Sequence, residues 1–191
     1  MALALCTWLT WDRSVSDLER GLFHGVNDLP AWMYRPLWLV MQLGALGAVF
    51  IVAVAALFVR RFRLAAELLG AGLAAYFAAS GLKDVVERGR PGAVLSDVVF
   101  HGPAANGLGF PSGHAAVSCA LTATVFPFLL GRWRRAVWLL PMTVGFARVF
   151  VGAHFPLDVV GGFALGYAVG AVAHLVGGSP GSVEPFVDAT G

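Results

Sequence analysis

The chain has 191 residues, of which 58% are hydrophobic and only 13% are charged. A soluble domain carries about a quarter of charged residues, so this composition excludes an ordinary soluble globular protein and favours a membrane protein. The net charge of +2 is too small to indicate binding to nucleic acid. The two cysteines, Cys6 and Cys119, lie in apolar stretches, so no disulfide framework is predicted.

Residues 1–34 are predicted to form an N-terminal interfacial segment. Its first part, "MALALCTWLTWD", has no positive region and no clear cleavage site, which favours an interfacial anchor over a secretory signal peptide. In the part that follows, apolar side chains recur at helical spacing with charges between them: Val15, Leu18, Leu22, Phe23 and Val26. This pattern is typical of an amphipathic helix that lies along a membrane interface and does not cross it.

Residues 35–177 contain apolar segments of about the length that a bilayer requires, roughly 20 residues. The segments are Pro36–Val59, Leu64–Leu82, Gly113–Leu130, Ala136–Gly152 and Leu157–Val176. We therefore predict an all-α fold: a polytopic membrane bundle of about five transmembrane helices plus the N-terminal amphipathic helix. Residues 178–191, "GSPGSVEPFVDATG", are rich in glycine, serine and proline and are predicted to be a disordered tail.

The basic residues indicate how the bundle is oriented. Two connections on the same side of the five-span arrangement carry clusters of arginine: Arg60, Arg61 and Arg63 in one, and Arg132, Arg134 and Arg135 in the other. The positive-inside rule places that side in the cytoplasm of a cell whose plasma (inner) membrane holds the protein. The connection 83–109 and the turn 153–156 then face outward, and the C-terminus is cytoplasmic.

Ionisable side chains gather at the outward ends of the predicted spans. They fall in three places: Lys83 and Arg90; Ser112, Gly113 and His114; and Arg148, His154 and Asp158. A half-buried arginine in a bilayer costs a few kcal/mol unless it is paired, so Arg148 is expected to have an anionic partner.

Most of these residues also have a purely structural interpretation. Lys83 is placed where a lysine at the end of a span extends to the interface, and Ser112 is placed as a helix N-cap. His154 and Asp158 have the spacing of a structural hydrogen bond within a helix. Arg88 is interpreted as a solvated loop charge.

Three cations lie among these residues: Lys83, Arg90 and Arg148. Together with the backbone N–H groups at a helix N-terminus, they form a site for a tetrahedral oxyanion. Asp158 lies one helical turn after His154, so its carboxylate can accept the Nδ1–H of that imidazole and leave Nε2 to attack phosphorus. His114 is placed to protonate the leaving oxygen. A metal site built from these two histidines and the aspartate is the alternative, but nearby cations repel a divalent ion. No metal or other cofactor is predicted.

These residues resemble the type 2 phosphatidic acid phosphatase superfamily. The family block K-x6-R-P is matched by "KDVVERGRP", which starts at Lys83, and the block P-S-G-H is matched by Pro111–His114. The block S-R-x5-H-x3-D is matched by "ARVFVGAHFPLD" except at its first position, where this chain has Ala147. The departure removes a hydroxyl that supports the phosphate site in family members.

The resemblance implies an all-helical core and a role for each matched residue. Phosphate oxygens would be bound by Lys83, Arg90, Ser112, Gly113 and Arg148. His154 would be the nucleophile that forms a phosphohistidine, Asp158 would orient it, and His114 would be the general acid.

The resemblance also implies a substrate, which is a lipid phosphate or pyrophosphate held in the bilayer. Candidates are a prenyl pyrophosphate such as undecaprenyl pyrophosphate, phosphatidate and phosphatidylglycerophosphate. Two alternatives stay open at this point: a phosphotransferase on the same scaffold, and a lipid binder that does no chemistry.

Overall fold

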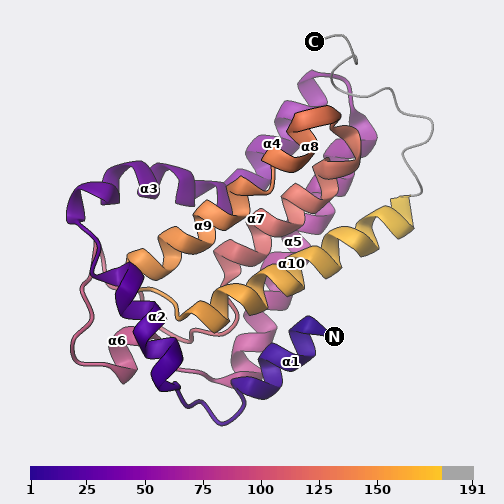
Figure 1. The fold of residues 1–191 in the computed structure, drawn as a ribbon. Helices are drawn as coiled ribbons and strands as arrows, with labels where there is room; N and C mark the ends of the chain where they lie inside the picture. The colour runs from indigo at the N-terminus through magenta and orange to yellow at the C-terminus, as the bar shows by residue number, and fades with distance from the viewer. Residues whose placement is uncertain (178–191) are drawn as a thin grey trace.

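The computed structural model describes residues 1–177, which form a bundle of α-helices (Figure 1). The helices are α1 (Ala2–Leu9), α2 (Asp17–Asn27), α3 (Tyr34–Met41), α4 (Leu46–Phe58), α5 (Phe62–Val86), α6 (Pro91–Val94), α7 (Gly113–Val125), α8 (Gly131–Ala136), α9 (Leu139–Phe150) and α10 (Pro156–Gly177). Short 3-10 helices add η1 (Ala31–Met33), η2 (Gln42–Gly44) and η3 (Phe126–Phe128). The predicted all-α class is confirmed for the described residues. The tail 178–191 lies outside them.

Helix α7 is the centre of the bundle and packs against α5, α9 and α10. Every residue from Ala115 to Thr124 is buried. Gly162, Gly166 and Gly170 recur every four residues along one face of α10, and a Cβ at any of them would collide with α7. At Gly162, for example, that Cβ would lie 2.5 Å from the carbonyl oxygen of Ser112. The glycines therefore allow α10 to approach α7 closely.

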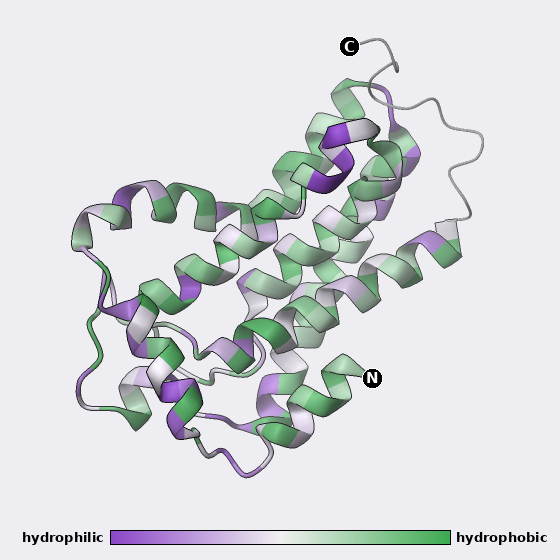
Figure 2. Ribbon diagram, in the orientation of Figure 1, coloured by the Kyte–Doolittle hydropathy of each residue, from purple (hydrophilic) through white to green (hydrophobic). Residues whose placement is uncertain are grey.

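Among the described residues, α5 and α10 are long and apolar enough to cross a membrane, and the bent pair α3–α4 would make a third span. Hydrophobic residues cover most of these helices (Figure 2). The segments predicted as the third and fourth spans are helical too, but the helices Gly113–Phe128 and Leu139–Phe150 are shorter than the roughly 20 residues of a span. The count of five spans stays a prediction.

The predicted first span, Pro36–Val59, is not one straight helix. It breaks at η2 and Ala45, whose backbone is extended, and the two halves meet at 67°. Its hydropathy is that of a continuous span, but Gly44 packs against the start of α7, where an added Cβ would lie 2.5 Å from the carbonyl oxygen of His114. The break therefore places the α3–α4 corner beside the residues predicted to form the site.

Helix α2 docks on the end of the bundle that carries those residues (Figure 1). Its inward face buries Glu19, Phe23 and Asn27, whereas Leu18 and Leu22 are exposed. The segment is helical, and two of its inward residues are polar and bind the bundle. Its place at a membrane interface stays a prediction.

The two arginine clusters lie at the opposite end of the bundle from α6 (Figure 1). Arg63 pairs with Glu67 at the start of α5, beside the last residue of α10, and Arg134 lies over the ring of Phe126 at the end of α7. Both clusters thus share one end of the bundle, while its orientation in a membrane stays a prediction.

Candidate active site

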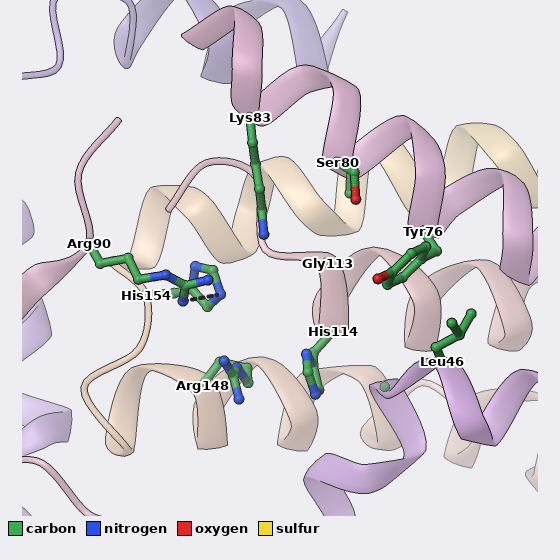
Figure 3. A pocket seen from close by; sticks show the side chains of 11 residues that line it. Leu46, Tyr76, Ser80, Lys83, Arg90, Gly113, His114, Arg148 and His154 are labelled. Atoms are coloured by element: carbon green, nitrogen blue, oxygen red, sulfur yellow. Dashed lines mark hydrogen bonds between the residues drawn. The ribbon is translucent and has the colours of Figure 1, made fainter. Parts of the chain in front are cut away.

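A cavity of about 190 Å³ opens at the end of the bundle where α5 and α9 end and α7 begins (Figure 3). Six of the eight predicted site residues line it: Lys83, Arg90, Gly113, His114, Arg148 and His154. Three of the six are cations, and no acidic side chain lines this cavity in the part of the chain that the structure describes. The cavity is therefore suited to a small anion.

The cations come from three separate segments. Lys83 is in the last turn of α5, which ends at Val86. The next residue, Glu87, caps the helix in a left-handed conformation with φ of 51°. Arg90 stands at the N-cap of α6, and its Nη1 donates to the carbonyl oxygen of Ala153 at 2.8 Å. Arg148 is in the last turn of α9. Because each is held by a different element, all three charges can surround one ligand.

His154 lies in the turn between α9 and α10, fully buried apart from its cavity face. Nη1 of Arg90 approaches its Nε2 at 3.3 Å. A guanidinium only donates, so Nε2 accepts and the proton of a neutral ring resides on Nδ1. Nδ1 is 3.6 Å from Oδ2 of Asp158, which is slightly longer than a hydrogen bond.

The charge state of His154 follows from its surroundings. Burial, and then the positive charges of Arg148, Arg90 and Lys83, hold the pKa of His154 well below its ordinary value. The imidazole is therefore neutral at neutral pH and keeps a lone pair on the nitrogen beside Arg90.

Asp158 and Ser112 do not line the cavity, and both side chains are fully buried behind it. The Asp158 carboxylate accepts the N–H of Phe155 at 2.9 Å, and the Ser112 N–H donates to the Asp158 carbonyl at 2.9 Å. Ser112 is at the N-cap position of α7, but its hydroxyl makes no capping bond and has no partner among the described residues. Its backbone thus ties the start of α7 to α10.

The expected anionic partner of Arg148 is not found among the described residues. Its Nη1 contacts the sulfur of Met41 at 3.1 Å, and its Nε makes no hydrogen bond. A charge in a bilayer is costly without a partner, but the Arg148 side chain faces a cavity whose other two charged residues, Lys83 and Arg90, are also cations.

The interpretation of Arg88 as a solvated loop charge is wrong. Its side chain is 0% exposed and contacts both Glu19 and Asp158. The cause is a local fold of the loop: Gly89 forms a bridge with Leu108, and the N–H of Gly109 donates to the Arg88 carbonyl at 2.7 Å, which directs the guanidinium inward. The partners of the guanidinium, Glu19 and Asp158, lie 69 and 70 residues away in the sequence, so no local sequence signal could have found this direction.

Ala147, which departs from the family motif, precedes Arg148 in the chain. It is fully buried in an apolar cluster with Leu37, Met41 and Phe150. In the described residues, no group of three or more histidine, cysteine, aspartate or glutamate side chains has an arrangement that could hold a metal ion.

Comparison with known proteins gives a family and a fold. The profile of the PAP2 superfamily matches residues 64–179. A decaprenylphosphoryl-5-phosphoribose phosphatase of Mycobacterium tuberculosis is 35% identical over 148 residues, which cover 74% of this chain and 72% of that protein. A lipid A 1-phosphatase of Rhizobium etli is 39% identical over 90 residues, or 44% of this chain, and the match spans only 38% of that relative's length.

The fold resembles a solved structure over most of its length. The crystal structure of a transmembrane PAP2 type phosphatidylglycerolphosphate phosphatase from Bacillus subtilis aligns with a TM-score of 0.71, covering 91% of this chain and 93% of that one. The two sequences are 21% identical, so this likeness concerns the fold alone.

Proposed function

The chain belongs to the PAP2 superfamily, and from this premise we propose that it is an integral membrane lipid phosphatase with its catalytic core in residues 35–177. The proposed reaction is hydrolysis of a lipid phosphate or pyrophosphate through a phosphohistidine intermediate. One observation carries the proposal: three cations and two imidazoles line the same cavity, and no carboxylate lines it in the described residues.

The phosphate group is proposed to bind between Lys83, Arg90 and Arg148. These three side chains donate to its oxygens and offset its charge, and the N–H of Gly113 at the start of α7 adds the favourable end of a helix dipole. The phosphate thereby becomes the anionic partner that Arg148 lacks. Ser112 contributes by holding this turn against α10, as its backbone bond to Asp158 supports.

In the first step, the lone pair on Nε2 of His154 attacks phosphorus while the bond from phosphorus to the lipid oxygen breaks. The negative charge of a bound phosphate favours the protonated form of His114, which gives its proton to the departing oxygen. Asp158 stabilises the positive charge that develops on the His154 ring by accepting its Nδ1–H.

In the second step, water attacks the phosphorus of the phosphohistidine and the bond from phosphorus to Nε2 breaks. His114, now neutral, takes a proton from that water. The products are the lipid alcohol and inorganic phosphate from a lipid phosphate, or the lipid monophosphate and inorganic phosphate from a pyrophosphate, and the enzyme returns to its starting state. No step requires a metal ion.

The lipid part is proposed to lie along α5. The cavity wall continues from Lys83 past Ser80 and Tyr76, on the same face of that helix, to Leu46 at the start of α4 (Figure 3). The preferred substrate class is a prenyl phosphate or pyrophosphate. The name of the mycobacterial relative, which matches most of this chain, supports a prenyl-linked phosphate.

The proposal is tested by measuring phosphate release from a panel of lipids by the full-length protein in detergent, with a chelator present. The panel contains farnesyl and undecaprenyl pyrophosphate, phosphatidate and phosphatidylglycerophosphate. We expect release of free phosphate from at least one lipid without any added acceptor, and fastest from a prenyl pyrophosphate. Transfer of the phosphoryl group to an added acceptor alcohol, without release of free phosphate, would indicate a phosphotransferase, and lipid binding with neither reaction would indicate a lipid binder.

The cavity is proposed to face outside the cell, because the arginine clusters lie at the other end of the bundle. In a variant with Cys6 and Cys119 replaced by alanine, we expect Ala104→Cys, in the exposed loop beside the cavity end, to react with an impermeant thiol reagent applied to intact cells. The matched variant Arg132→Cys, in exposed α8, is expected to react only after permeabilisation. Labelling of Arg132→Cys in intact cells, and of Ala104→Cys only after permeabilisation, would mean that the cavity faces the cytoplasm.

A further inference from the structure

Arg88 and Glu19 form a buried ionic cluster directly behind the cavity. Their side chains are 0% and 4% exposed, and Asp158, the third member, is 0% exposed. A cluster of charges in a protein interior is costly unless its hydrogen bonds are well made. We propose that Arg88 and Glu19 are positioning residues that hold the Asp158 carboxylate toward His154, an inference that rests on the proposed function of that pair.

The Asp158 carboxylate is held from two sides. Its Oδ1 accepts from Nη1 of Arg88 at 2.9 Å, and its Oδ2 accepts the N–H of Phe155 at 2.9 Å. The same Oδ2 is the oxygen that lies 3.6 Å from Nδ1 of His154. Because rotation of the carboxylate would break both hydrogen bonds, Arg88 keeps Oδ2 directed at the imidazole.

Glu19 in turn fixes the direction of the Arg88 guanidinium. Its two carboxylate oxygens pair with Nη1 and Nη2, so the guanidinium plane has little freedom to rotate. Nη2 also donates to the carbonyl oxygen of Ser14 at 3.0 Å, and the guanidinium lies 5.1 Å from the centre of the Phe155 ring. The contacts of Nη1, Nη2 and the face of the guanidinium therefore direct Nη1 at Asp158, while Nε makes no hydrogen bond among the described residues.

Glu19 also reaches α10 itself. Its Oε1 accepts the N–H of Leu157 at 3.0 Å, one residue before Asp158. The contacts thus form a closed ring. Glu19 binds Arg88, Arg88 binds Asp158, and the backbone N–H of Leu157, the neighbour of Asp158, binds Glu19. Glu19 lies on α2, outside the residues 64–179 that match the family profile. The N-terminal helix, on this inference, is part of the catalytic apparatus and not only a membrane anchor.

A purely structural role for the cluster makes a different prediction. If Glu19 only attached α2 to the bundle, its loss would lower thermal stability and would add to the effect of any other substitution. If Glu19 acts through Asp158, its loss lowers kcat in the wild type but has little further effect once the aspartate is gone.

The test is a double-mutant cycle in kcat with farnesyl pyrophosphate in detergent micelles. We expect Glu19→Ala to lower kcat about tenfold or more, with KM changed by less than about twofold, as is common for residues that orient a reactive group. Asp158→Asn is expected to lower kcat by at least about a hundredfold because it cannot accept the Nδ1–H in the same way. In the Asp158→Asn background, Glu19→Ala should cost less than about twofold.

The matched control is Glu87→Gln, which breaks the exposed pair of Glu87 with Arg13 and so loosens the same two segments without touching Asp158. Its kcat should equal that of the wild type. If Glu19→Ala does not give monodisperse protein, Glu19→Gln serves in the same cycle. Unchanged kcat in the Glu19 variant, or an equal loss in both backgrounds, overturns the inference alone. Wild-type kcat in Asp158→Asn overturns the proposed mechanism as well.

Discussion

Replacing His154 with alanine is expected to lower phosphate release by at least about a thousandfold at saturating lipid, because the proposed nucleophile is removed. The attacking atom is Nε2 of His154, because Arg90 approaches it and the proton of the ring is assigned to the other nitrogen, Nδ1. The measurement is the release of inorganic phosphate at steady state, with a rapid acid- or base-quench of enzyme and labelled lipid to trap the intermediate. A phosphohistidine is stable to base and labile to acid, so the wild type should retain label in base and His154→Ala should retain none.

A second histidine provides the control for this experiment. His174, near the end of α10, donates from Nε2 to the carbonyl oxygen of Ala123 at 3.0 Å and lies at the opposite end of the bundle from the cavity. His174→Gln should therefore release phosphate at the wild-type rate. Base-stable label in His154→Ala that disappears in His114→Ala would reverse the roles assigned to the two histidines.

Local sequence determined the parts of the site that depend on short spacings. His114 lies at the N-terminus of an apolar run, and a helix does begin at Gly113. His154 and Asp158 are four residues apart, and the structure places Nδ1 and Oδ2 3.6 Å from each other. The spacing within each motif could be read from the sequence, but the six residues that line the cavity come from separate segments, and the packing of α5, α7 and α9 brings them together.

Contacts between distant segments could not be predicted in the same way. Glu19 and Arg88 are 69 residues apart in sequence, and their pairing depends on where α2 docks. In the sequence each charge has opposite charges nearby, which makes a solvated pair the simpler interpretation. The bend at Gly44 was missed for a related reason, because hydropathy reports that a segment is apolar but not that a glycine is needed where it meets α7.

Arg148→Met is expected to lower phosphatase activity and to raise the stability of the protein without ligand. The side chain is half-buried, contacts the sulfur of Met41, and has no carboxylate partner among the described residues. Its charge is repelled by those of Arg90 and Lys83, and a bound phosphate would relieve this electrostatic cost. Methionine retains most of the apolar stem and removes the charge.

We therefore expect kcat/KM to fall about 100- to 1000-fold in Arg148→Met, because one donor to the charge of the transition state is lost. The same variant should unfold at a higher temperature than the wild type when no anion is present. A gain of about 1 kcal/mol would raise the Tm by about 2–4 °C in a protein of this size. Residues that bind ligands often stabilise the free protein less than an apolar replacement does.

Added vanadate gives the decisive comparison, because it mimics the pentacoordinate phosphorus. An anion at a concentration 100 times its Kd stabilises the state that binds it by about 2.7 kcal/mol, so the wild-type Tm should rise in vanadate and that of Arg148→Met should rise much less. Arg35→Met, which removes an exposed arginine on α3, should change neither the Tm in buffer nor the response to vanadate. A lower Tm in Arg148→Met together with an undiminished vanadate response would mean that Arg148 supports the fold. A higher Tm with a lost response would mean that its charge is held in place for the phosphate, because the free protein would then be more stable without it.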